Sequence, residues 1–345
     1  MMRKIGQKIR VISLFIVILG SILVGTGYYY VFYPNTRVQD EGIIHVWPQQ
    51  TAIQVLDSLR IKGYIKNSST LLAVAKLKKY ISSAKSGKYR IRAGMNNNEL
   101  INMLRSGDQI PVQCTFNNIR TLPELVEVIS KQLSFSAGEL YALLNDTTQL
   151  ASLGFTPATI LALFIPNTYE MYWNISAQDF LKRMQKEYQR FWNTWRLQKA
   201  QALNLKPVEI ITLASIIEEE TTKREEYPII AGVYLNRLER GIKLDACPTL
   251  KFAWGDFSIN RILDCHLAID SPYNTYKYAG LPPGPIRVAS IQVIDGVLNR
   301  QKHDYLYFCA KSDFSGYHHF SRTLRQHNAY ARAYHQELNR RKIWK

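Results

Sequence analysis

An uncharged apolar segment near the N-terminus constrains this chain more than any other feature of its sequence. Residues 11–33 read VISLFIVILGSILVGTGYYYVFY and contain no Asp, Glu, Lys or Arg. At 1.5 Å per residue, a helix of this length is about 35 Å long, which is enough to cross the hydrocarbon core of a bilayer. We therefore predict a transmembrane anchor at 11–33.

The charges before this segment predict its orientation. Arg3, Lys4, Lys8 and Arg10 precede it, with no acidic residue among them. By the positive-inside bias, residues 1–10 stay in the cytoplasm, and the body of the chain lies on the extracytoplasmic, periplasmic side of the inner (plasma) membrane. The alternative is a cleaved signal peptide. No small-x-small cleavage site follows the apolar run, which favours an uncleaved single-pass anchor.

The charge and the cysteines narrow the classes of partner. A net charge of +17 suggests an anionic partner, such as phospholipid headgroups or acidic wall polymers, or simply a soluble basic surface. We expect no nucleic acid, since there is no arginine-rich tract or RNA-binding signature. The four cysteines include no C-x-x-C pair, so a zinc site is not expected. Cys247 and Cys265 could form a disulfide or remain thiols, and spacing leaves both open.

The patterning after the anchor predicts an α+β chain of two parts. Residues 34–42 are predicted as a linker, and residues 43–117 as a small module with the outline of a LysM-like carbohydrate-binding unit. In that module we expect strands at 43–47, 88–92 and 110–116, and helices near 51–62, 68–80 and 97–104. Residues 118–345 are predicted as a mixed α+β domain that is mostly helical up to residue 200.

One helix carries the strongest candidate for chemistry. The segment 207–221 has an apolar stripe, and Glu218 extends it because it follows Ala214 by four residues. Glu219 falls on a more polar side. A carboxyl at the end of a buried stripe loses hydration, so its pKa should rise, as general-acid cleavage of a glycosidic bond requires. The alternative is that the acids at 218–220 form a solvated charge run.

A loop rich in Pro and Gly offers candidate substrate contacts. Tyr273 and Tyr276 provide flat faces on which a sugar can stack, and Asn274 provides an amide for hydroxyl or acetamido groups. The alternative for this loop is a rigid connector.

Two further features have weaker functional interpretations. Asn236, on a helix predicted from Pro228 to Gly241, either faces a site or lies on the surface. The pair His318-His319 raises the possibility of a metal. It has no acidic cluster near it in the sequence, and we expect no metal.

Six segments together resemble the endolytic murein transglycosylase family, also called MltG or YceG-like. They are FIPNTYE at 164–170, LASIIEEET at 213–221, VYLNRL at 233–238, SPYNTY at 271–276, GLPPGPI at 280–286 and HHFSRTLRQHN at 318–328. The resemblance covers nearly the whole chain, including the anchor and the LysM-like module.

The resemblance implies a catalytic transglycosylase domain at 118–345 that needs no cofactor. It identifies Glu218, the first acid after LASII, as the catalytic glutamate. Glu220 is then expected to orient Glu218 or bind substrate, and Tyr169 to contact substrate. The chain departs from the family pattern at Cys247 and Asn167, where the family usually has Asp, and these departures bear on substrate contacts.

The function that this resemblance implies is lytic cleavage of peptidoglycan. Glu218 would protonate the MurNAc–GlcNAc bond of nascent glycan strands and then act as a base, leaving a 1,6-anhydroMurNAc end. Peptidoglycan synthases are the protein partners that such a role suggests. The alternative is a catalytically inactive, membrane-anchored scaffold that binds peptidoglycan.

Overall fold

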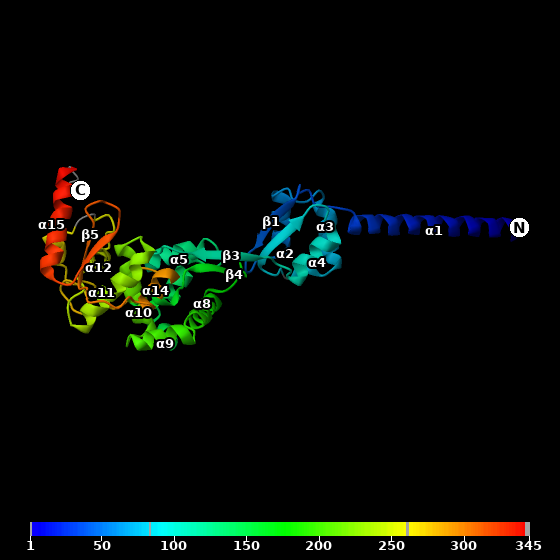
Figure 1. Cartoon of the computed structure of the whole chain (residues 1–345). Helices are drawn as coiled ribbons and strands as arrows, with labels where there is room; N and C mark the ends of the chain where they lie inside the picture. Colours follow the sequence, from blue (N-terminus) through cyan, green and yellow to red (C-terminus); the bar gives the residue numbers. More distant parts are fainter. Residues whose placement is uncertain (1, 83, 260–261, 342–345) are drawn as a thin grey trace. The chain divides into compact units, whose positions relative to one another are not determined.

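The structure, a computed structural model, describes residues 2–82, 84–259 and 262–341. It divides into two compact units (Figure 1). Unit 1 contains the residues up to Gln113, with Gln132–Ser134 and Glu170–Ile175; unit 2 contains Cys114–Lys131, Phe135–Tyr169 and the residues from Ser176 onward. The boundary therefore falls near the predicted start of the second domain.

The N-terminal apolar segment forms one long helix, α1 (Met2–Phe32). Its part from Gln7 to Phe32 has a mean hydropathy of 2.3 and is not buried in the protein. The helix is therefore long and apolar enough to cross a membrane, and its exposed apolar surface needs an apolar environment.

The core of unit 1 lies between a two-stranded sheet and three helices. The elements are β1 (Glu41–Val46), α2 (Ala52–Ile61), α3 (Ser68–Leu77), β2 (Gly87–Arg92) and α4 (Asn97–Ser106), coloured blue to cyan in Figure 1. β1 and β2 are antiparallel, with Ile44 opposite Tyr89. Both of these side chains are buried, together with Val55 and Leu100 of the helices. The order of β1, α2, α3 and β2, with two helices between paired strands, agrees with the predicted outline. The likeness of this module to LysM stays a proposal.

The predicted linker is packed into unit 1. Asn35 and Thr36 are buried. The Asn35 amide donates to Asn97 Oδ1 at 2.6 Å, and the Thr36 hydroxyl donates to the Arg92 carbonyl at 2.9 Å. The segment between α1 and β1 is thus held by side-chain hydrogen bonds that composition alone does not indicate.

A second pair of strands was only half predicted. β3 (Pro111–Phe116) agrees with the expected strand, and it pairs with β4 (Asn167–Tyr172). β4 lies in a stretch expected to be mostly helical. It becomes a strand because a partner distant in the sequence supplies its hydrogen bonds, and propensity does not report such a partner.

Unit 2 is mainly helical around one central helix. Its elements are α5 (Leu122–Ser130), α6 (Ala137–Leu143), α7 (Thr147–Leu153), η2 (Ile160–Leu163), α8 (Ala177–Phe191), α9 (Thr194–Ala202), α10 (Pro207–Glu220), η3 (Arg224–Glu226), α11 (Tyr227–Glu239), α12 (Cys247–Trp254), α13 (Asp264–Leu267), α14 (Ile291–Leu298), β5 (Tyr307–Ala310), β6 (His318–Ser321) and α15 (Leu324–Arg340). α10 packs against α11, α12 and α14. Every residue of α10 from Ile210 to Ile217 is buried, so this helix has no solvent face along that stretch.

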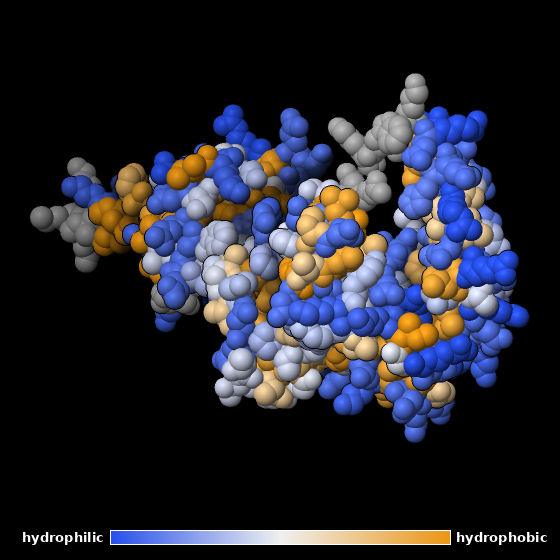
Figure 2. All heavy atoms as spheres, turned by 90° about the vertical axis from the view of Figure 1, so that its left-hand side faces the viewer, coloured by the Kyte–Doolittle hydropathy of each residue, from blue (hydrophilic) through white to orange (hydrophobic). Residues whose placement is uncertain are grey.

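The face shown in Figure 2 is mainly hydrophilic, with apolar residues in separate groups. α15 packs against β5 and β6 and has no fully buried residue. The candidate site begins at the C-terminal end of α10, beyond its buried stretch.

Candidate functional site

The three consecutive acids at the end of α10 point in different directions. An α-helix turns about 100° per residue, so side chains two positions apart lie about 200° apart around the axis. Glu218 and Glu220 therefore face nearly opposite sides of α10, and a single reacting bond cannot lie between them.

Glu218 is bound by the segment that leads into α14. Its Oε2 accepts a hydrogen bond from the backbone N–H of Ser290 at 2.9 Å, and Arg287 Nε lies 3.5 Å from the same oxygen. The side chain of Glu218 is 16% exposed. These contacts hold the Glu218 carboxyl at the start of α14.

Glu219 is held by two arginines. Arg287 donates to its Oε1, and Arg120 Nη2 lies 3.1 Å from its Oε2. Arg287 also donates to Asn118 Oδ1 at 2.5 Å. These guanidinium groups offset the repulsion between neighbouring carboxylates and the unfavourable helix dipole at this end of α10. The acids are not a freely solvated charge run.

The third acid, Glu220, has a raised pKa. Burial raises its pKa to about 7, although the hydrogen bond from Tyr234 and the charge of Lys251 act in the opposite direction. The Tyr234 hydroxyl donates to Glu220 Oε1 at 2.9 Å. Near neutral pH this carboxyl therefore exists in both the protonated and the ionised form, as a residue that gives and then takes a proton requires.

Glu220 lines a cavity of about 510 Å³ in unit 2. The other lining residues are Tyr234, Arg237, Leu244, Asp245, Cys247, Tyr276, Leu306, Tyr307, Phe308, Leu324 and His327. They come from α11, the turn before α12, the 271–286 loop, β5 and α15. Four of the segments quoted for the family resemblance thus meet at this cavity, and its aromatic walls suit the apolar faces of sugar rings.

Hydrogen bonds fix the cavity walls. Arg237 donates to the Leu306 carbonyl at 2.7 Å and to Asp245 Oδ2 at 3.0 Å, so it joins α11 to two other wall segments. The Tyr276 hydroxyl lies 3.1 Å from Cys247 Sγ. Cys247 and Cys265 are both free, so the disulfide that the sequence left open is not formed in the structure.

Of the predicted contact residues, Glu220 and Tyr276 line the cavity, whereas Asn236 and Asn274 are used within the protein. The Asn236 amide donates to the carbonyls of His303 and Tyr305 at 2.7 and 3.0 Å. Asn274 is fully buried; its amide donates to two loop carbonyls, and its Oδ1 accepts from two backbone N–H groups. The Asn274 amide therefore has no free group in the structure, and its contact with substrate stays a prediction.

The two remaining predicted contacts are aromatic residues that pack internally. Tyr273 packs against Phe252, with ring centroids 4.7 Å apart. Tyr169 is buried against Phe116, and its hydroxyl donates to the Ile165 carbonyl at 2.6 Å. Tyr169 thus packs in the core, and its contact with substrate stays a prediction. Aromatic residues stack on sugars and fill cores equally well, and sequence does not separate the two uses.

Arg237, Tyr307 and His327 line the cavity but are not among the substrate contacts expected from the sequence. An arginine that is only 8% exposed is not distinguishable in sequence from a surface one. Tyr307 and His327 come from segments that begin more than 60 residues after the end of α11 at Glu239. Their membership in the HHFSRTLRQHN region and the adjoining strand was the available signal.

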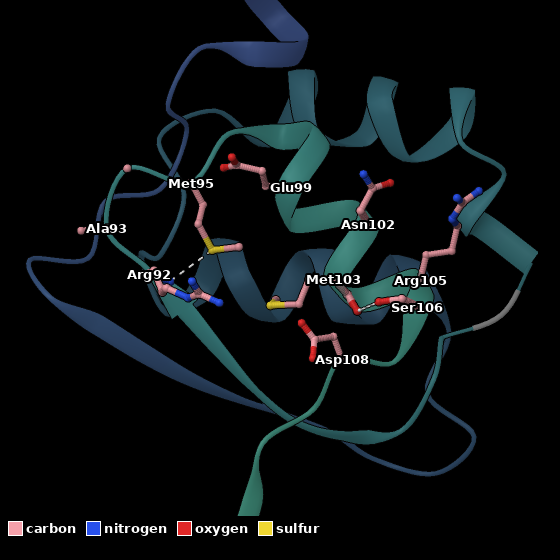
Figure 3. Close-up of a pocket in the computed structure, with 10 residues that line it drawn as sticks. Arg92, Ala93, Met95, Glu99, Asn102, Met103, Arg105, Ser106 and Asp108 are labelled. Atoms are coloured by element: carbon pink, nitrogen blue, oxygen red, sulfur yellow. Dashed lines mark hydrogen bonds between the residues drawn. The ribbon is translucent and has the colours of Figure 1, made fainter.

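A second hollow, of about 830 Å³, lies in unit 1 (Figure 3). Figure 3 shows Arg92, Met103 and Asp108 around it, with Glu99 and Asn102 at its rim. None of its lining residues is aromatic. It lacks the flat rings on which sugars stack, and none of the predicted site residues lies there. Among the described residues, the cavity at Glu220 is therefore the better candidate site.

Comparisons with known proteins match most of this chain. The model of a family described as YceG-like matches residues 44–333. An endolytic murein transglycosylase of Bacillus subtilis (strain 168) is 30% identical over 297 residues, which cover 81% of each chain. One of Streptococcus pneumoniae serotype 2 is 28% identical, over 76% of this chain and 53% of its own length. A crystal structure of a YceG-like protein from Listeria monocytogenes has a TM-score of 0.56 and 26% identity, and the match covers 85% of this chain and 99% of that one.

Proposed function

The chain belongs to the YceG-like family, and on that premise we propose that it is an endolytic peptidoglycan transglycosylase. It cleaves the bond between MurNAc and GlcNAc within a glycan strand and leaves a 1,6-anhydroMurNAc end. The observation that carries the proposal is the family match over residues 44–333, which includes the acids at the end of α10.

We propose that Glu218 makes the proton transfers, as the family resemblance implies. Its Oε2 accepts a hydrogen bond from the Ser290 N–H, and its side chain is 16% exposed. Glu220 is the alternative, because burial raises its pKa to about 7 and it lines the cavity.

The reaction needs one carboxyl. Glu218 protonates the glycosidic oxygen, the C1–O bond breaks, and positive charge develops on the MurNAc C1. The Glu218 carboxylate then removes the proton from the C6 hydroxyl of the same sugar. O6 closes onto C1, and Glu218 regains its proton. Attack within one sugar has a high effective molarity, so no activated water is required.

A matched pair of variants tests the residue assignment. Glu218→Gln keeps the shape of the side chain but removes the proton, so we expect cleavage of purified sacculi to fall by about 10²–10⁴-fold. Glu220→Gln should retain more of the activity. Mass spectrometry of the soluble products measures both, and thermal unfolding checks that both variants fold. An active Glu218→Gln beside a folded, inactive Glu220→Gln would give the role to Glu220.

A scaffold that binds peptidoglycan without cutting it is the alternative function. Binding of the wild-type protein to sacculi with no release of soluble fragments would support it. Products lighter by one water than reducing-end fragments would support the transglycosylase, and the heavier reducing ends would indicate a hydrolase.

We further propose that α1 is a retained single-pass anchor, with residues 1–10 cytoplasmic and both units extracytoplasmic. Asn97 of α4 donates to the Tyr30 carbonyl at 2.8 Å, so the end of α1 takes part in the fold of unit 1. Such an anchor would keep the enzyme beside newly made strands, where peptidoglycan synthases are its proposed partners.

A further inference from the structure

A buried arginine contacts two of the acids at the end of α10. Arg287 directly follows the GLPPGPI segment, and its side chain is 9% exposed. Its Nη1 donates to Glu219 Oε1, and its Nη2 donates to Asn118 Oδ1 at 2.5 Å. Because these bonds use different terminal nitrogens, they fix the plane of the guanidinium group.

The remaining nitrogen of this guanidinium group faces Glu218. Arg287 Nε is buried and has no hydrogen-bond partner among the described residues. It lies 3.5 Å from Glu218 Oε2, which is longer than an ordinary hydrogen bond. A buried N–H without a partner is costly to the fold, so its place beside a carboxyl calls for an explanation.

The Glu218 carboxyl is held through one of its two oxygens. Oε2 accepts the hydrogen bond from the Ser290 N–H at 2.9 Å and faces Arg287 Nε, and neither contact involves Oε1. Oε1 is therefore the oxygen left to give a proton and take it back. When a proton leaves Oε1, negative charge spreads over both oxygens, and a donor aimed at Oε2 then interacts more strongly.

We propose that Arg287 is a positioning residue for Glu218, one that holds the carboxyl at Oε2 and stabilises the carboxylate formed during proton transfer. The inference rests on the proposed proton-transferring role of Glu218. As charge develops on the carboxyl, the long contact from Nε shortens to a hydrogen bond. A donor of this kind favours the transition state over the bound substrate, so it acts on kcat and not on binding.

Arg287→Met and Arg120→Met form a matched pair. Both remove an arginine that pairs with Glu219, but only Arg287 also contacts Glu218. On soluble, uncrosslinked glycan strands, we expect Arg287→Met to lower kcat about 10–100-fold with KM unchanged, as the loss of a hydrogen bond to a charged group implies. The Arg120 side chain is 41% exposed, so Arg120→Met should keep kcat within about twofold of the wild type.

Arg287→Lys separates positioning from simple packing. It keeps the positive charge but lacks the planar fork that binds Glu219 and Asn118, so it should restore part of the kcat lost in Arg287→Met. A purely structural arginine would lower the thermal stability of both variants and leave the kcat of the folded protein unchanged. If Arg287→Met does not fold, Arg287→Lys and Arg120→Lys make the same comparison, and kcat should fall only in the first.

A folded Arg287→Met with the kcat of the wild type would overturn the inference, as would an equal loss of kcat in Arg120→Met or a rise in KM alone. Glu218→Gln distinguishes this failure from a failure of the proposed function. If Glu218→Gln is inactive while Arg287→Met matches the wild type, only the positioning role fails. If Glu218→Gln is active, the role assigned to Glu218 fails, and the inference fails as well.

Discussion

The raised pKa of Glu220 lowers the stability of the fold at high pH. Its pKa is about 7 in the folded protein, against an ordinary value of 4.5. The folded state therefore binds the proton more tightly than the unfolded state, and stability falls as pH rises from 4.5 through 7. At higher pH the full cost is about 3 kcal/mol, at 1.36 kcal/mol per pKa unit.

Glu220→Gln should consequently stabilise the protein at high pH. We expect the unfolding free energy to rise by about 1–3 kcal/mol at pH 8 and to change little at about pH 3, well below both pKa values, where the wild-type carboxyl is protonated in both states. Denaturant unfolding at the two pH values measures this difference. A gain that is the same at both pH values would show that the buried charge is not its source.

Tyr234→Phe should raise the pKa of Glu220 further. The Tyr234 hydroxyl donates to the Glu220 carboxylate and stabilises it, so its removal favours the protonated form. The pH range over which the stability of the fold declines should then extend upward by about one unit, as expected from the loss of one hydrogen bond to a charged group. Denaturant unfolding across this range makes the measurement. A downward or absent shift would contradict the role of this hydrogen bond.

The sequence predicted the helix and its acids but not which acid faces the cavity. Counting from Ala214 placed Glu218 on the apolar side, yet α10 is buried on all sides from Ile210 to Ile217. A helix buried all round has no single apolar side, so periodicity does not orient its end. The orientation is set by Arg287, Ser290 and Tyr234, which are distant in the sequence.

At the level of elements, local signals predicted much of the fold. Thr51 marks a helix start in the sequence and makes a capping box in the structure. The start of α4 is predicted too, although its cap is Asn96, one residue before the asparagines favoured by the sequence. β4 escaped prediction because its strand character comes from pairing with β3. Local chemistry therefore predicts caps and helices better than strands whose partners lie far along the chain.

The GLPPGPI loop depends on a close backbone approach at one glycine. A Cβ at Gly284 would lie 1.9 Å from the Ala158 carbonyl oxygen, a backbone atom with no freedom to rotate away. Gly284→Ala should destabilise the protein by about 2 kcal/mol or more. Gly138, inside α6, has open space at its Cβ position, and Gly138→Ala should stabilise by up to about 1 kcal/mol. Thermal unfolding of the pair tests the contrast; equal effects would contradict it.

At the scale of the whole molecule, the proposed N-terminal anchor bears on the location of the protein in the cell. A retained anchor predicts that the protein in cells keeps residues 11–33 and stays in the membrane fraction after high-salt washing, until detergent releases it. N-terminal peptide mapping of the membrane-extracted protein makes the measurement. A mature chain that begins beyond residue 30 would identify the segment as a signal peptide.

The hydrogen bond from Asn97 to the Tyr30 carbonyl has a mechanical consequence. It ties the C-terminal end of α1 to α4 within unit 1. Spanning helices tilt when the bilayer becomes thinner than their apolar length. Any such tilt would be passed directly to unit 1, so local changes in lipid thickness would steer the orientation of this module at the membrane surface.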